Sequence, residues 1–284
     1  MKVLSAAWHL LRDTFAGFID DEALSWGASI AYYTLFSIAP VLLVVVAIAG
    51  LVFGRDAAEG AIVDQFSVLM GHQTAEALQG MIENAAKPRE GTLATVIGMI
   101  VLFIAVSGVF SEVQSAMNAI WKATAPKGTT FTRLARARLV SMGLVVTAGF
   151  LLMVSLAASA ALEGFSTYLK FVFPEVQVAL GVVDVVLSAL LIAGLFAAMF
   201  KVLPDVDIAW RDVAAGALAS TLLFEAGKYA IAFYIGQSNF ASSYGAAGAL
   251  IILLVWIYYS AQIFLLGAEF SRAYAKRYGS HANP

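Results

Sequence analysis

Six apolar segments, each long enough to cross a lipid bilayer, constrain this chain more than any other feature of its sequence. Crossing the hydrocarbon core of a bilayer takes roughly 20 mostly apolar residues. Of the 284 residues, 61% are hydrophobic and only 13% are charged, whereas a soluble domain carries about 25% charge. The expected spans run over about Trp26–Phe53, Leu93–Ile120, Leu139–Leu162, Val178–Val202, Val213–Ile235 and Ala247–Phe270.

Each span is expected to be a helix, because a helix satisfies its backbone hydrogen bonds within one segment. The two-residue alternation that marks a transmembrane β-strand is missing from these segments. No Ser/Gly linker or low-complexity tract interrupts the chain. We therefore predict an all-α integral membrane protein with six transmembrane helices, which forms a single polytopic domain over residues 1–284.

Two regions outside the spans have the residue spacing of amphipathic helices that lie at a membrane surface. The first nineteen residues place apolar side chains on one face, namely Val3, Leu4, Ala7, Trp8, Leu11, Phe15, Phe18 and Ile19. The loop Gly54–Thr92 repeats the pattern at Ile62, Phe66, Leu69, Met70, Leu78, Met81 and Ile82, with Gly71 and His72 between the two groups. We predict an interfacial helix at the N-terminus and two short ones on the outer membrane face.

The distribution of Lys and Arg predicts the orientation of the chain. Twelve of the 17 cationic residues fall at one side of the predicted spans, four fall at the other, and Lys228 lies within a span. Because loops rich in Lys and Arg stay on the cytoplasmic side, both termini are expected in the cytoplasm. The segment Trp121–Arg138 carries five of the twelve and no acidic residue.

The chain lacks the residues of common catalytic and metal sites. It contains no Cys, which excludes disulfides, thiol nucleophiles and Cys-ligated metals. His9, His72 and His281 fall in separate regions, so we expect no shared metal site or general base. Neither a Gly-x-Ser-x-Gly nor a His-Glu-x-x-His motif occurs. The net charge of −2 does not favour nucleic acid. We expect no enzymatic activity, cofactor, metal or nucleic-acid partner.

Glu225 and Lys228 are the first candidates for function. They lie three residues apart in the fifth span, hence on one helix face, and an ionisable group at mid-span costs on the order of 3 kcal/mol. The pair is either a substrate or proton site, with Tyr229 lining the same cavity, or a structural ion pair that clamps two helices. Glu269 is expected to form only a solvated end-of-helix pair with Arg272.

Three further residues are candidates to line a cavity within the membrane, and a purely structural role is the alternative for each. Glu112 lies in the inner half of the second span, on a helix with a small, polar flank suited to close packing. Asp184 lies about two turns from the outer end of the fourth span. Pro40 is expected to kink the first span, and the freed carbonyl either lines a cavity or is satisfied by Ser37.

Several motifs resemble the YihY/BrkB family of bacterial inner-membrane proteins. The run from Ala28 to Pro40 resembles the first-span signature of the family, and Asn118 with Trp121 is similar to the Asn-x-x-Trp ending of its second span. The other matches occur in the expected order, at Pro204, Trp210–Asp212, Gly216, Tyr244–Leu254, Trp256–Gln262 and Leu266–Phe270. Together these matches extend from about residue 20 to residue 270.

The resemblance implies six spans and a location in the bacterial inner membrane. Members of the family have been linked to serum resistance, and a related protein to transport of a lipid-A precursor; an older ribonuclease label is generally regarded as a mistake. The leading hypothesis is a transporter, exporter or flippase of a lipid-like or small amphipathic substrate, with membrane lipids as partners. The alternative is a non-transporting envelope scaffold or assembly protein. A water-filled cavity reaching Glu225 favours transport, whereas a dry bundle favours the scaffold.

Overall fold

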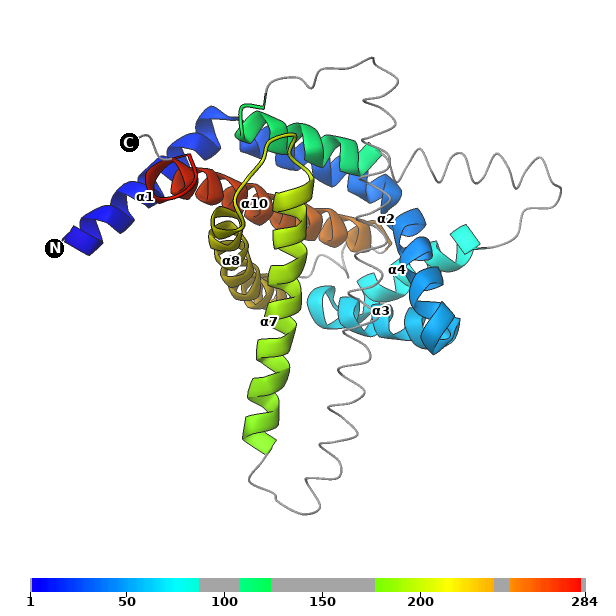
Figure 1. Cartoon of the computed structure of the whole chain (residues 1–284). Coiled ribbons are helices and arrows are strands. Elements are labelled where there is room, and N and C mark those ends of the chain that lie inside the picture. Colours follow the sequence, from blue (N-terminus) through cyan, green and yellow to red (C-terminus); the bar gives the residue numbers. More distant parts are fainter. Residues whose placement is uncertain (1, 87–107, 124–176, 238–245, 282–284) are drawn as a thin grey trace.

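The computed structural model describes residues 2–86, 108–123, 177–237 and 246–281, and this part of the chain is helical (Figure 1). The predicted all-α class is therefore confirmed in the described residues. Residues 108–120 form a helix that ends just before Trp121. The labelled helices are α1 (Lys2–Asp20), α2 (Ala23–Phe53), α3 (Arg55–Met70), α4 (His72–Ala86), α7 (Gln177–Val202), α8 (Trp210–Gln237) and α10 (Ala246–Tyr278).

Three stretches of the described helices are long and apolar enough to cross a membrane: Ala23–Phe53, Val185–Val202 and Ala247–Tyr278. They correspond to the predicted first, fourth and sixth spans. Helix α8 covers the predicted fifth span over 28 residues, but Glu225 and Lys228 lower its hydropathy. The third predicted span lies outside the described residues, as does the first part of the second. The count of six spans stays a prediction.

Helices α3 and α4 occupy the loop in which two short helices were predicted. Gly54 lies between α2 and α3 and Gly71 lies between α3 and α4, and both have positive φ angles, +84° and +85°. A residue with a side chain is strained at such φ values. The apolar side chains Ile62, Leu78 and Ile82 are buried in one cluster with residues of α2 and α10. The apolar faces of α3 and α4 thus pack on the protein, and their predicted place at the membrane surface remains untested.

Helix α2 continues through Pro40 without interruption, and Figure 1 shows it bending along its course. Proline removes one backbone hydrogen bond and is a usual cause of such bends. The Ser37 hydroxyl donates to the carbonyl of Thr34 at 3.4 Å, not to the carbonyl of Phe36, which the proline ring frees. The bend agrees with the predicted kink at Pro40. Ser37 does not satisfy the freed carbonyl of Phe36, which was one of the two predicted alternatives.

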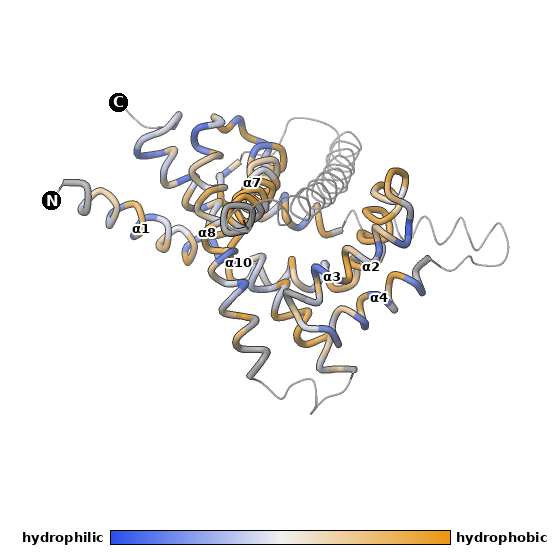
Figure 2. Tube along the Cα trace, turned by 90° about the horizontal axis from the view of Figure 1, so that it is seen from below, coloured by the Kyte–Doolittle hydropathy of each residue, from blue (hydrophilic) through white to orange (hydrophobic). Residues whose placement is uncertain are grey.

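Helices α8 and α10 pack closely because small residues face each other where they meet. A Cβ atom added at Gly216 would lie 2.7 Å from the backbone oxygen of Gly267 and 2.6 Å from Cβ of Ser271. The hydroxyl of Ser271 also donates to the carbonyl of Asp212 at 2.7 Å. Small residues are the usual contact residues between membrane helices. Figure 2 shows that α2 and α7 are mostly apolar, whereas α1 mixes apolar and polar residues.

Candidate functional site

The predicted pair on α8 forms an ion pair. The Lys228 Nζ atom lies 2.6 Å from Oε2 of Glu225, and the two side chains are 24% and 23% exposed. The ammonium group also lies 5.4 Å from the centre of the Tyr229 ring, in a cation–π contact. The structure thus brings three predicted site residues, Glu225, Lys228 and Tyr229, together on one face of α8.

The same turn of α8 is held against α10 through Tyr259. Its hydroxyl donates to the carbonyl of Leu223 at 3.2 Å, and a side chain at Gly227 would overlap the Tyr259 ring. The second carboxylate oxygen of Glu225, Oε1, is buried and has no hydrogen-bond partner in the described part of the chain. A buried polar atom without a partner is costly. This oxygen can therefore accept a hydrogen bond from a ligand.

The remaining candidates do not join this pair in the described residues. Glu112 is half-buried in the helix over 108–120, and there it makes no hydrogen bond or ion pair with a described residue. Its neighbour Asn118 instead pairs with Asp205 before α8, with bonds of 2.9 and 2.8 Å. Pro40 lies inside α2. Asp184 lies in α7, and its side chain lies outside the described part of the structure.

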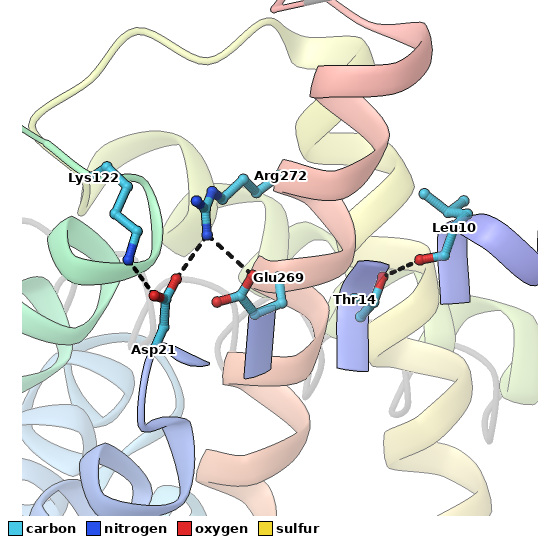
Figure 3. Close-up of polar contacts among 6 residues, drawn as sticks. All are labelled: Leu10, Thr14, Asp21, Lys122, Glu269 and Arg272. Atoms are coloured by element: carbon cyan, nitrogen blue, oxygen red, sulfur yellow. Dashed lines mark hydrogen bonds and ion pairs between the residues drawn. The ribbon is translucent and has the colours of Figure 1, made fainter. Parts of the chain in front are cut away.

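A second polar site, which we call the charge cluster, comprises Asp21, Lys122, Glu269 and Arg272 (Figure 3). Lys122 and Arg272 approach the carboxylate of Asp21 from opposite sides. Lys122 pairs with Oδ1 of Asp21, and an Arg272 nitrogen donates to Oδ2 at 2.7 Å. The same Arg272 nitrogen lies 3.5 Å from Glu269. The cluster therefore joins the start of α2, the end of the 108–120 helix and α10.

The prediction of a solvated Glu269–Arg272 pair is wrong. Glu269 is only 2% exposed, and the Arg272 side chain is 13% exposed. Helix α1 covers them because Gly17 has no side chain: a Cβ atom there would lie 2.5 Å from Oε2 of Glu269. Glu22, with φ of +54°, makes the sharp connection from α1 to α2 that directs Asp21 toward α10.

A pocket of about 680 Å³ opens beside the charge cluster, between α1, α10 and Lys122. It falls in the size range of ligand sites. Four carboxylates and four cationic side chains line it, so its formal charge is balanced: Asp13, Asp20, Asp21 and Glu269 with Lys122, Arg272, Lys276 and Arg277. Within the described residues, no group of three or more His, Asp or Glu side chains is arranged to hold a metal ion. We call this cavity the charged pocket.

Sequence reasoning did not find the charged pocket, because its residues come from both ends and the middle of the chain. Asp13 pairs with Arg277 at 3.0 Å, a separation of 264 positions in sequence. The sequence does carry one signal for this pocket. Three acidic residues follow one another where α1 ends, Asp20, Asp21 and Glu22, and the last turn of α10 carries the cationic residues Lys276 and Arg277. The pocket residues do not include Glu225 or Lys228, so the two sites are separate.

The chain matches a protein family described as Virulence factor BrkB over residues 14–284. It is 32% identical to a UPF0761 membrane protein of Vibrio campbellii, over 87% of this chain and 76% of that protein. Similar proteins of Rhodospirillum centenum and Alcanivorax borkumensis are 28% and 30% identical. The chain spans 57% and 58% of their lengths, little more than half. No solved structure matches the chain.

Proposed function

Since the chain belongs to the virulence factor BrkB family of membrane proteins, we propose that it moves a lipid-like or small amphipathic substrate across the bacterial inner membrane. The proposal includes six spans and both termini in the cytoplasm, as the excess of Lys and Arg on one side favours. It also includes the absence of enzymatic activity.

The observation that carries the proposal is that only one of the two carboxylate oxygens of Glu225 on α8 has a partner in the described residues. Its Oε2 atom pairs with Lys228 at 2.6 Å, while its buried Oε1 atom has no partner in the described residues. Ionisable residues within membrane spans mark substrate or proton pathways more often than they serve stability alone. A substrate with a hydrogen-bond donor satisfies Oε1 without breaking the ion pair, so binding costs little electrostatic energy.

A reconstitution experiment tests this function directly. The purified full chain is placed in vesicles that carry a trace of fluorescent, NBD-labelled phospholipid, and dithionite then bleaches the label in the outer leaflet. Transport of lipid between the leaflets exposes the inner-leaflet label, so the bleached fraction should rise above one half. The variant Glu225→Gln with Lys228→Met should reduce this excess. Bleaching equal to that of protein-free vesicles would argue against lipid movement.

The second candidate function is a non-transporting envelope scaffold. One observation favours it: the Glu225–Lys228 pair is locally satisfied at Oε2, and Tyr259 holds the same turn of α8 against α10. On this alternative the ion pair only fixes the packing of the two helices. A scaffold would leave the vesicle assay at its protein-free level while the protein remained folded and inserted.

A further inference from the structure

We propose that the charged pocket between α1 and α10 binds a phosphoethanolamine group, in which a primary ammonium is joined to a phosphodiester. The proposal rests on the proposed function only in taking a membrane lipid as the source of this group. It names a headgroup class and a second site, remote from Glu225. Binding at this site is measured at equilibrium, whether or not the protein moves lipid.

The acidic side of the pocket offers unused hydrogen-bond acceptors. Glu269 is 98% buried, and its Oε1 atom has no partner among the described residues; in Figure 3 one of its carboxylate oxygens is directed away from Arg272. Asp20 also lines the pocket, is exposed, and makes no ion pair in the described part of the chain. A primary ammonium carries three N–H donors, as the Lys side chain does, so it matches a pocket side that offers more than one acceptor.

The cationic side of the pocket offers a free donor for an anion. Lys276 lines the pocket at its exposed rim and pairs with no acid in residues 2–86, 108–123, 177–237 and 246–281. Arg277, one position on, is 3.0 Å from Asp13 and keeps further N–H groups for a second acceptor. A phosphodiester oxygen accepts charge-assisted hydrogen bonds of this kind.

The charge balance selects a zwitterion over a simple ion. The eight ionisable residues that line the pocket are four acids and four bases. Asp20 and Lys276 are the lining residues that make no ion pair in the described part of the chain, so a lone anion would leave Asp20 unmatched and a lone cation would leave Lys276 unmatched. A phosphoethanolamine group carries both charges, so each meets its complement. A phosphocholine group has no N–H donor, and a phosphoglycerol group has no positive charge.

The position of the pocket favours a lipid as the source. It lies at the end of α10, a helix apolar enough to cross a membrane, and beside α1. Helix α1 exposes the large apolar residues Trp8, Phe15 and Ile19, with exposed fractions between 54% and 69%. An exposed apolar stripe of this kind is typical of a helix at a membrane surface, where phospholipid headgroups are concentrated.

The test measures binding to the purified full chain by native mass spectrometry and by thermal shift. Dioleoyl phosphatidylethanolamine should bind about tenfold or more tightly than the matched phosphatidylcholine or phosphatidylglycerol, since each lacks one of the two charge-assisted contacts. Asp20→Asn and Lys276→Gln should each weaken that binding by about two- to fivefold, as expected for exposed charge pairs. Asp64→Asn, an exposed acid on α3 outside the pocket, should leave it unchanged.

Asp20 and Lys276 are exposed, so their variants should fold, and a loss of binding cannot be ascribed to unfolding. Binding of glycerophosphoethanolamine without lipid would assign the pocket to the soluble form of the same group. Equal affinity for the three lipids, or full binding by both variants, would overturn the proposal. Failure of the vesicle assay with intact selective binding would instead remove only the proposed transport.

Discussion

Removing one member of the Glu225–Lys228 pair should destabilise the protein, whereas removing both should restore much of the stability and abolish function. The single variants are Glu225→Gln and Lys228→Met, and the double variant combines them. Each single change leaves the other charge without its partner at 2.6 Å. The double variant removes both charges, so no uncompensated charge remains at this partly buried position on α8.

The structure sets the size of the effect. Breaking a fully buried pair by removing one partner costs about 3–5 kcal/mol. Because these side chains are about one quarter exposed, water screens the remaining charge, and we expect about 1–3 kcal/mol for each single variant. A loss of 1 kcal/mol lowers the melting temperature of a protein of this size by about 2–4 °C. Each single variant should therefore melt roughly 2–12 °C below the unaltered protein, and the double variant close to it.

Melting temperatures in detergent give the stability of each variant, and complementation of a deletion strain gives its function. The exposed contact between His72 and Glu76 on α4, with atoms 3.3 Å apart and side chains 77% and 62% exposed, provides the control. Its double variant, His72→Gln with Glu76→Gln, should change neither measurement. A Glu225–Lys228 double variant that is stable and complements fully would refute a functional role for the pair and support the scaffold.

Three further predictions follow from named residues. Single Cys substitutions in this Cys-free chain should react with an impermeant maleimide in intact cells at position 87 and not at position 136; the reverse would overturn the orientation. Purified protein should cleave RNA no faster than a mock preparation; metal-dependent cleavage lost on one polar substitution would contradict this. Gly17→Ala should lower stability by about 1–3 kcal/mol through overpacking against Glu269. Gly60→Ala places its methyl group in open space on α3 and should not lower stability. Equal melting temperatures for the two variants would refute the close contact between Gly17 and Glu269.

The features predicted from sequence are those that depend on neighbouring residues. The apolar runs that became α2, α7 and α10 are local, as is the three-residue spacing that pairs Glu225 with Lys228. The break at Gly71 is local too, because only its own backbone angle requires glycine. These features depend on the helical repeat and on the length of the apolar segments, and both can be read directly from the sequence.

The features that sequence reasoning missed depend on residues far apart in the chain. The burial of Glu269 follows from Gly17, some 250 positions earlier, and the neutralisation of Asp21 follows from Lys122 and Arg272. A single sequence does not show which helix will cover a charged end. The apolar spacing of α3 and α4 also does not show that Ile62, Leu78 and Ile82 pack on α2 and α10, and their place at the membrane surface stays a prediction.

Helix α10 connects the two candidate sites. Tyr259 packs against Gly227 beside the Glu225–Lys228 pair, and Glu269 packs against Gly17 at the charged pocket. These two residues of α10 are ten positions apart, which is about 15 Å along a helix. In both places a glycine on the neighbouring helix allows the close approach, so a shift of α10 relative to both α1 and α8 would disturb both contacts together. On the proposed transport function, movement of α10 would act on both sites, whereas on the scaffold alternative each contact would stay closed.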